Sequence, residues 1–339
     1  MDWNRGYSAA YYMTIVDPDT WRDTRRIKLN GGSINRMTTD LRESADIDCE
    51  PLDEGYENWI RIWLDARQAD DSVHLPIFTG LASSPGKIIN GMRIESKLQC
   101  YSVLKPASDI LLPRGWYAAR DFKAGDMITK LLRSCKAPVD VQGETPRLSS
   151  YIIAEENETN LTMTNKILDA IGWRLRIEGD GTIQICPEAE EPSATFGTLR
   201  ADCIEPRISV EKDLFECPNV FRAASGNNSV EVRDEDPDSA LSTSSRKREV
   251  WKEESNITLF EGETLQSYAK RRLRELQRVS MTASYDRRYH PDVLPGDIVR
   301  INYPAQNLVG DFCVNSQKIT LGHGVKTSEE VAQIRSQNR

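Results

Sequence analysis

The chain has 339 residues, which is long enough for two or three domains that each bury a hydrophobic core. Its formal charge of -8 and its pI near 5.2 argue against a protein whose main partner is nucleic acid, because binding phosphates requires a basic surface. The sequence has no apolar run long enough to span a bilayer and no basic-then-apolar signal pattern at its start, so we expect assembly in a cytoplasm without membrane insertion.

Residue patterns typical of catalysis and metal binding are missing from the sequence. The seven cysteines lie far apart, with no CxxC pair and an odd total, so they predict neither a disulfide framework nor a zinc site. The histidines His74, His290 and His323 lack metal-ligand spacing. The sequence also has no GxSxG elbow, no Walker-type loop and no GxGxxG. We therefore predict no catalytic site, no cofactor and no metal.

Short apolar or alternating runs separated by turns predict a strand-rich domain over residues 1–105. In the run WIRIWL at 59–64, isoleucines and leucine alternate with tryptophans and arginine, which is the two-residue period of a strand. Both faces of this strand are partly apolar, so we expect a core on one side and a neighbouring subunit or element on the other. In the run MRIESKLQCYSV at 92–103, apolar residues such as Leu98 and Cys100 alternate with polar residues such as Lys97 and Gln99. Several strands without long helices favour a barrel or a sandwich.

Residues 106–205 predict a compact α+β module. The run GDMITKLLRSC at 125–135 reads as a short helix that stops before Pro138. A second helix is expected within 157–173, with Gly172 as its C-terminal stop. The segment WRLRI, the turn EGDG and the segment TIQIC then predict a hairpin.

Strands return over residues 206–325, interrupted by a polar segment at 234–249 that we interpret as a surface loop. Three alternate acids from Asp234 imitate the start of a calcium loop. However, Pro237 stands where the turn should develop and Ser245 where a bidentate glutamate should close the site, so the segment favours a solvated acidic loop.

A basic amphipathic helix is predicted over residues 263–280. Its apolar residues, which include Leu265, Leu273 and Leu276, recur at three- and four-residue steps and form one stripe. We expect this stripe to pack on a sheet formed around PGDIVRINY at 295–303. The last residues, 326–339, are polar and are expected to form a short tail.

The order of these elements resembles the baseplate or tail hub proteins of contractile-tailed bacteriophages and phage-like particles, the family related to the first part of type VI secretion spike proteins. Each segment is weak alone, and their order carries the resemblance. The segments are LPIFTGLASS at 75–84, MRIESKLQCYSV at 92–103, GDMITKLLRSC at 125–135, NKILDAIGWRLRIEGDGTIQI at 165–185, YAKRRLRELQR at 268–278, VLPGDIVRINYP at 293–304 and GDFCVNSQKITLGHG at 310–324.

The resemblance implies an α+β, predominantly β fold with two tube-type β-barrels, at 1–105 and 206–325, separated by the small module at 106–205. It implies a homotrimeric ring of pseudo-sixfold symmetry in the tail tip or baseplate of a virion, assembled in the host cytoplasm. The implied partners are a tail tube or tube-initiator protein, a central spike protein and a tape measure protein, with DNA passing through without specific binding. No fused lysozyme or peptidase is recognisable, so we do not expect an enzyme.

Aromatic residues dominate protein–protein hot spots, so several large side chains are candidates for subunit contacts. An alternative for each aromatic is a place in the core of its own domain. A rival function from another class is a glycan-binding or glycan-degrading tail protein, and a third is a peripheral baseplate adaptor. The candidate interface residues are Trp59, Trp63, Trp116, Tyr117 and Trp251, with Arg271 and Arg274 on the polar face of the predicted helix.

Overall fold

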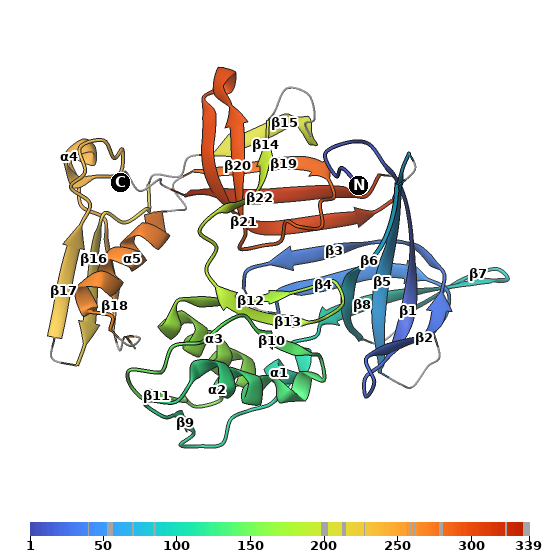
Figure 1. Cartoon of the computed structure of the whole chain (residues 1–339), viewed down its shortest axis with the longest axis horizontal. Helices are drawn as coiled ribbons and strands as arrows, with labels where there is room; N and C mark the ends of the chain where they lie inside the picture. Colours follow the sequence, from blue (N-terminus) through green and yellow to red (C-terminus); the bar gives the residue numbers. More distant parts are fainter. Residues whose placement is uncertain are drawn as a thin grey trace.

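The computed structural model shows a predominantly β chain with helices in a central module and in one insertion (Figure 1), which confirms the predicted fold class. The two closed β-barrels that the resemblance implies stay a prediction. The residues that the structure describes are 1–39, 41–52, 57–69, 71–83, 86–197, 203–211, 215–226, 228–255, 257, 259, 262–277, 281–322 and 324–334.

The N-terminal part forms a curved antiparallel array, as its alternating runs predict. In β5, Ile60, Ile62 and Leu64 are fully buried on one face, while Trp59 and Arg61 are buried on the other. The strand is therefore covered on both sides, and the second cover is an element of the same chain. The strands are β1 Ser8–Asp17, β2 Arg22–Ile27, β3 Leu29–Met37, β4 Glu43–Cys49, β5 Asn58–Gln68, β6 Asp71–Ala82, β7 Gly86–Asn90 and β8 Arg93–Ser102.

Strands from both ends of the chain join in one sheet of 14 strands, whose main path runs β15-β19-β22-β21-β3-β4-β8-β6-β5-β1-β2. The seam between the two halves is the antiparallel pairing of β21 with β3, in which Ile319 lies opposite Ile34. Both of these side chains are fully buried. The C-terminal strands are β14 Pro192–Phe196, β15 Ile204–Glu211, β19 Thr282–Arg288, β20 Ile298–Tyr303, β21 Leu308–Leu321 and β22 Lys326–Ile334.

The expected tail at 326–339 is wrong over its first part, because residues 326–334 form β22 between β19 and β21. Thr327, Glu329 and Val331 alternate inward along this strand. The alternation could not be recognised in the sequence because one of its inward residues, Glu329, is charged. In the fold it is paired with Arg287, with the guanidinium Nη2 2.6 Å from a carboxylate oxygen. Residues 335–339 lie outside the described residues.

The module at 106–205 contains the two predicted helices and the predicted hairpin, and it lies along one side of the sheet (Figure 1). Gly172 ends α3 in the left-handed conformation, with φ of 66°, as expected of a helix stop. Its elements are α1 Lys105–Asp109, β9 Tyr117–Ala118, α2 Ala124–Leu131, the 3-10 turn Leu132–Cys135, β10 Val139–Val141, β11 Ile152–Ile153, α3 Asn160–Ile171, β12 Trp173–Ile177 and β13 Ile183–Pro187.

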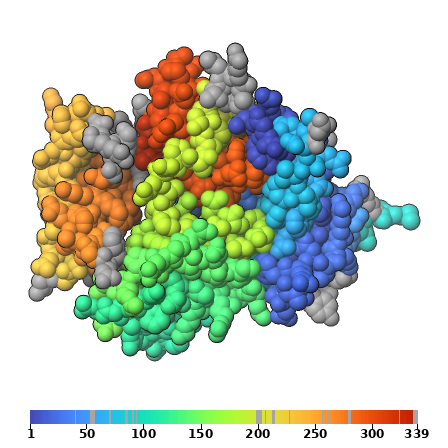
Figure 2. All heavy atoms as spheres, in the orientation of Figure 1, coloured from blue at the N-terminus to red at the C-terminus, as the bar shows by residue number. Residues whose placement is uncertain are grey.

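Between the neighbouring strands β15 and β19 the chain leaves the sheet and builds a separate small unit, which we call the insert, residues 215–277. It forms the yellow and orange lobe at one end of the molecule (Figures 1 and 2). Its three-stranded sheet has the order β17-β16-β18. The elements are β16 Val220–Ser225, β17 Asn228–Arg233, α4 Thr243–Arg246, β18 Trp251–Glu254 and α5 Leu265–Gln277.

The predicted helix is present as α5, but its expected packing on 295–303 is wrong. Leu273 and Ala269 are buried against Phe221 and Ala223 of β16, inside the insert. The β16–β17 hairpin offers α5 an apolar face inside the insert, although β20 lies nearer in the sequence. The predicted end of the helix at residues 278–280 lies outside the described residues.

Candidate assembly surfaces

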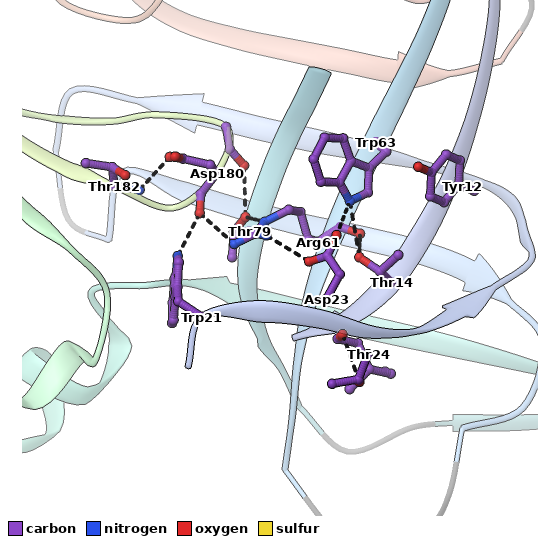
Figure 3. Close-up of polar contacts among 12 residues, drawn as sticks. Tyr12, Thr14, Trp21, Asp23, Thr24, Arg61, Trp63, Thr79, Asp180 and Thr182 are labelled. Atoms are coloured by element: carbon purple, nitrogen blue, oxygen red, sulfur yellow. Dashed lines mark hydrogen bonds and ion pairs between the residues drawn. The ribbon is translucent and has the colours of Figure 1, made fainter. Parts of the chain in front are cut away.

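A polar joint fixes the module to the N-terminal strands, and the guanidinium of Arg61 is its centre (Figure 3). Arg61 donates hydrogen bonds to Asp23 Oδ1 at 2.8 Å, to Thr79 Oγ1 at 3.0 Å and to the backbone oxygen of Asp180 at 3.0 Å. Asp180 lies in the turn between β12 and β13, whereas the other three residues lie on β2, β5 and β6. One buried cation therefore holds three strands and the module together.

Backbone atoms of the same turn complete the joint. Trp21 Nε1 donates to the backbone oxygen of Asp180 at 3.0 Å, and Thr79 Oγ1 donates to that of Gly179 at 2.9 Å. A Cβ atom added at Gly179 would lie only 2.0 Å from the backbone oxygen of Pro76. The turn sequence EGDG, which sequence reasoning used only as a hairpin signal, is therefore also what allows the turn to approach the strand this closely.

The two candidate tryptophans of β5 have different surroundings. Trp59 is buried in the core shared by β5 and the module, and its ring lies edge-on to Trp21 with centroids 5.5 Å apart. Trp63 is partly exposed and donates from Nε1 to Asp23 Oδ2 at 2.8 Å. Its ring stacks on His74, with centroids 4.4 Å apart and planes within 2°. Only Trp63 keeps a surface that another subunit can touch.

Trp116 and Tyr117 lie on a segment of the module that we call the ribbon, residues 111–123 alongside 147–159, in which the two-residue strands β9 and β11 pair and an isolated bridge lies toward each end. Its register is constant from the bridge of Leu111 with Thr159, through Tyr117 with Ile153, to Lys123 with Arg147. Trp116 packs against the module core and Tyr117 is exposed. The ribbon therefore has one face on the core and one face toward solvent.

The candidates Trp251, Arg271 and Arg274 all belong to the insert. Trp251 is partly exposed between two guanidinium groups, with Arg222 at 4.9 Å and Arg233 at 5.5 Å from its ring centroid. Such cation–π contacts hold an indole ring in place without burying it.

The arginines of α5 face two ways. Arg271 is ion-paired with Glu263 at 3.2 Å and with Glu275 at 3.0 Å, whereas Arg274 is exposed. Burial raises the pKa of Asp169 in α3 of the module, and the positive charge of Arg272 in α5 opposes this rise. Part of the arginine face is therefore turned toward the module of the same chain.

The segment at 234–249 is built into the insert. It contains α4, and Asp234 Oδ2 accepts hydrogen bonds from Ser239 Oγ at 2.7 Å and from Gln277 Nε2 at 3.0 Å. In the part of the chain that the structure describes, no group of three or more acidic, histidine or cysteine side chains is placed to hold a metal ion. The acids Asp234 and Asp236 instead accept hydrogen bonds within the turns of this segment, and Asp234 also accepts one from Gln277 at the end of α5.

A cavity of about 400 Å³ lies where the β12–β13 hairpin, β6 and the loop at 289–294 meet. Its lining is mainly polar, and it includes Arg36, Arg176, Glu178 and Asp292. Arg176 is held by Glu178 at 2.7 Å. Tyr289 is the aromatic side chain among the described lining residues. Its arginines Arg36 and Arg176 are already ion-paired to Glu43 and Glu178. We therefore interpret the cavity as a gap between packed parts of the chain.

Exposed apolar side chains at the β7–β8 hairpin are a feature that sequence reasoning missed. The alternation of 92–103 is confirmed, because Leu98 and Cys100 are buried while Lys97 and Gln99 are exposed. Ile94 shares their face in the sequence pattern but is exposed. Alternation shows which residues share a face, and it carries no signal for where a strand runs past the edge of its neighbours.

Comparison with solved structures shows that the chain shares its fold with phage tail proteins. The tail protein from Neisseria meningitidis MC58 has a TM-score of 0.70 and 16% identity, covering 97% of this chain and 97% of that chain. The 43 kDa tail protein of prophage MuSo2 from Shewanella oneidensis has a TM-score of 0.69 and 11% identity, covering 96% of this chain and 98% of that chain.

A protein of the type VI secretion system has the same fold. The E. coli c3393 protein, a component of that system, has a TM-score of 0.54 and 9% identity, covering 96% of this chain and 77% of that chain. No family model matches the sequence, and no curated protein matches it. The resemblance drawn from the order of the segments is therefore confirmed at the level of the fold.

Proposed function

We propose that this chain is a structural hub protein of a phage-type tail or baseplate and that it has no catalytic activity. The observation that carries the proposal is the whole-length agreement of its fold with two tail proteins, which leaves no large part of the chain outside the shared fold. In this role the chain assembles as a homotrimer whose ring joins a sixfold tail tube to a threefold spike.

The sheet supports this proposal because each chain contributes two strand-rich halves to it. The halves meet at the β3–β21 seam within one continuous 14-stranded sheet. Three copies would therefore place six strand-rich halves around one axis, which is the number that a sixfold tube requires. A closed ring of this kind uses the same pair of surfaces at every subunit contact.

The charge of the chain supports passage of DNA and a tape measure protein through the ring. A formal charge of -8 repels phosphate groups, so nucleic acid slides through an acidic channel without being held. The tail tube or its initiator protein and the central spike protein are the partners that this role implies. The location that follows is the tail tip or baseplate of a virion.

Native mass spectrometry and particle images of the purified chain test the proposal. The expected result is a trimer of about three times 38.4 kDa that appears in images as a ring with a central channel. A monomer that binds or cleaves glycans would contradict the proposal and favour the rival glycan-acting function. A chain found only at the periphery of intact particles would favour the adaptor function.

Helices long and apolar enough to cross a membrane are not found among the described residues.

A further inference from the structure

A row of buried polar side chains, which we call the polar row, crosses the 14-stranded sheet and passes over the seam between β21 and β3 (Figure 1). Its members lie directly opposite one another on adjacent strands, so they share one face of the sheet. Each of them exposes 5% or less of its surface. In order across the sheet, the members are Tyr285 on β19, Glu329 on β22, Gln317 on β21, Arg36 on β3 and Glu43 on β4.

The polar row lies along the boundary between two hydrophobic cores. On one side of it, Ile34 and Ile319 belong to the core of the N-terminal strands. On the other side, Val314 and Val331 belong to the core of the C-terminal strands. Apolar burial is not directional, so these cores alone do not determine how far one half of the sheet is shifted along the other.

A shift of β3 by two residues along β21 shows what the polar row adds. Such a shift keeps the same faces inward. Ile34 would then meet Leu321 instead of Ile319, which exchanges one buried apolar neighbour for another. Arg36 would meet Ile319, about 7 Å from its present place, because a strand rises about 3.4 Å per residue. The cost of the shift therefore falls on a buried charged side chain.

The loop at 289–293, which follows β19, contacts both strands of the seam at this point. Gln317 Nε2 on β21 donates to the backbone oxygen of Val293 at 2.8 Å. Burial raises the pKa of Tyr289, and the charge of Arg36 on β3 together with a hydrogen bond from it opposes this rise, so the hydroxyl lies beside that guanidinium. The loop can make both contacts only while Arg36 and Gln317 lie opposite each other.

We infer that the polar row and the loop at 289–293 form a register lock, which holds β3 and β21 in one alignment. In the shifted alignment, Arg36 would lose the hydroxyl of Tyr289 and lie against apolar side chains. Replacing a whole buried ion pair by apolar residues often leaves stability unchanged, whereas a buried charge without its partners is strongly unfavourable, so such groups can select one arrangement among several. The inference concerns the two halves of a single chain, so it goes beyond the proposed function and does not depend on it.

Disulfide trapping in the full chain reports the register of the seam. Lys318→Cys is combined either with Asn35→Cys, which lies directly opposite, or with Met37→Cys, which comes opposite only after the two-residue shift. Side chains directly opposite each other are within disulfide range, and those two positions further along are not. Peptide mass spectrometry after mild oxidation locates the cross-link and separates it from any that involve the natural cysteines.

The test variant is Arg36→Met with Glu43→Leu, which replaces the ion pair by apolar side chains and is made in both cysteine pairs. Thr327→Val is the matched control, because Thr327 is fully buried on β22 outside the polar row and its Oγ1 has no hydrogen bond from the described residues. We expect the test variant to melt no lower than the wild type, and its yield of the shifted cross-link to rise about fivefold or more. Thr327→Val should keep the wild-type yield.

A folded test variant whose shifted cross-link stays at the wild-type yield would overturn the inference, since apolar packing would then suffice to set the register. An equal rise in Thr327→Val would overturn it as well, because the effect would not be specific to the polar row. If the test variant does not fold, Tyr289→Phe decides, since it removes only the hydroxyl beside Arg36. Its shifted yield should rise about twofold, and an unchanged yield would count against the lock. The oligomeric state, which tests the proposed function, is measured separately.

Discussion

At the residue scale, the carboxylates of two buried ion pairs in the sheet have pKa values shifted in opposite directions. Arg287 donates to both carboxylate oxygens of Glu329, at 2.6 Å and 2.8 Å, and Gln317 adds a third hydrogen bond at 2.6 Å. Burial alone would raise the pKa of Glu329, but the charge of Arg287 and these donors outweigh it and lower that pKa. The pair is therefore satisfied as an ion pair inside the sheet.

Replacing Glu329 by alanine should be strongly destabilising, because it leaves the buried charge of Arg287 without a partner. We expect a loss of about 3–5 kcal/mol in the free energy of unfolding, measured by urea denaturation. The matched control is Glu330→Ala, since Glu330 is the next residue of β22 and is exposed. Its expected change is within about 0.5 kcal/mol. Equal effects of the two substitutions would show that the pair contributes nothing specific.

The pair of Arg36 with Glu43 is less complete. The atoms Arg36 Nε and Glu43 Oε1 are 2.7 Å apart, but Glu43 Oε2 receives no hydrogen bond from the described residues. Burial therefore outweighs the effect of Arg36 and raises the pKa of Glu43 to about 7 from 4.5. A carboxyl whose pKa is higher in the folded than in the unfolded chain favours folding while it is protonated, at low pH.

Stability should thus decrease as pH rises from about 5 to about 8, by an amount on the order of 2–3 kcal/mol from this one group. The comparison is between the wild type and Glu43→Gln, whose neutral amide removes the titration. Urea denaturation at several pH values should show this part of the slope in the wild type and its loss in the variant. The interpretation fails if both proteins respond identically to pH in this range.

At the element scale, the β12–β13 turn packs against β6 and thereby positions the module on the N-terminal strands. We predict that Gly179→Ala displaces this turn from β6, because the new Cβ atom would collide with the backbone of Pro76. Hydrogen exchange should show lost protection in the module and at Arg61. Gly322→Ala is a suitable control, since nothing lies within 4 Å of its added Cβ atom. An unchanged exchange pattern in Gly179→Ala would mean that the strands shift to accept the methyl group.

The insert has its own small core, so damage to it should stay local. Leu273→Asp places a charge against Phe221 and Ala223, and we expect it to unfold the insert while the 14-stranded sheet survives. Limited proteolysis should then cut within residues 215–277 and leave the remaining fragments associated. Arg274→Ala, at an exposed site one residue away, should be cut no faster than the wild type. Global unfolding of Leu273→Asp would show that the insert supports the sheet.

At the scale of the whole molecule, the sequence predicted most of the elements but few of their partners. Helix stops and two-residue alternation are local signals, so α3 with its Gly172 and β5 with its alternation were predicted. The pairing of β21 with β3 joins residues nearly 300 positions apart, and nothing local encodes it. For the same reason the ribbon and the joint at Arg61 were not predicted as units, although Trp116 and Tyr117 of the ribbon were candidates.

The seam makes the two halves of the sheet depend on each other. Ile319 and Leu321 of β21 share one buried core with Ile34 of β3, whereas Phe312 and Val314 of the same strand lie in the core of the C-terminal strands, so β21 contributes to both cores. We therefore expect the strands of 1–105 and of 282–334 to unfold in one transition, separately from the insert, which has its own core. Calorimetry combined with hydrogen exchange measures this directly. If the two halves lost protection in separate transitions, each would be an independent domain and the seam a weak contact between them.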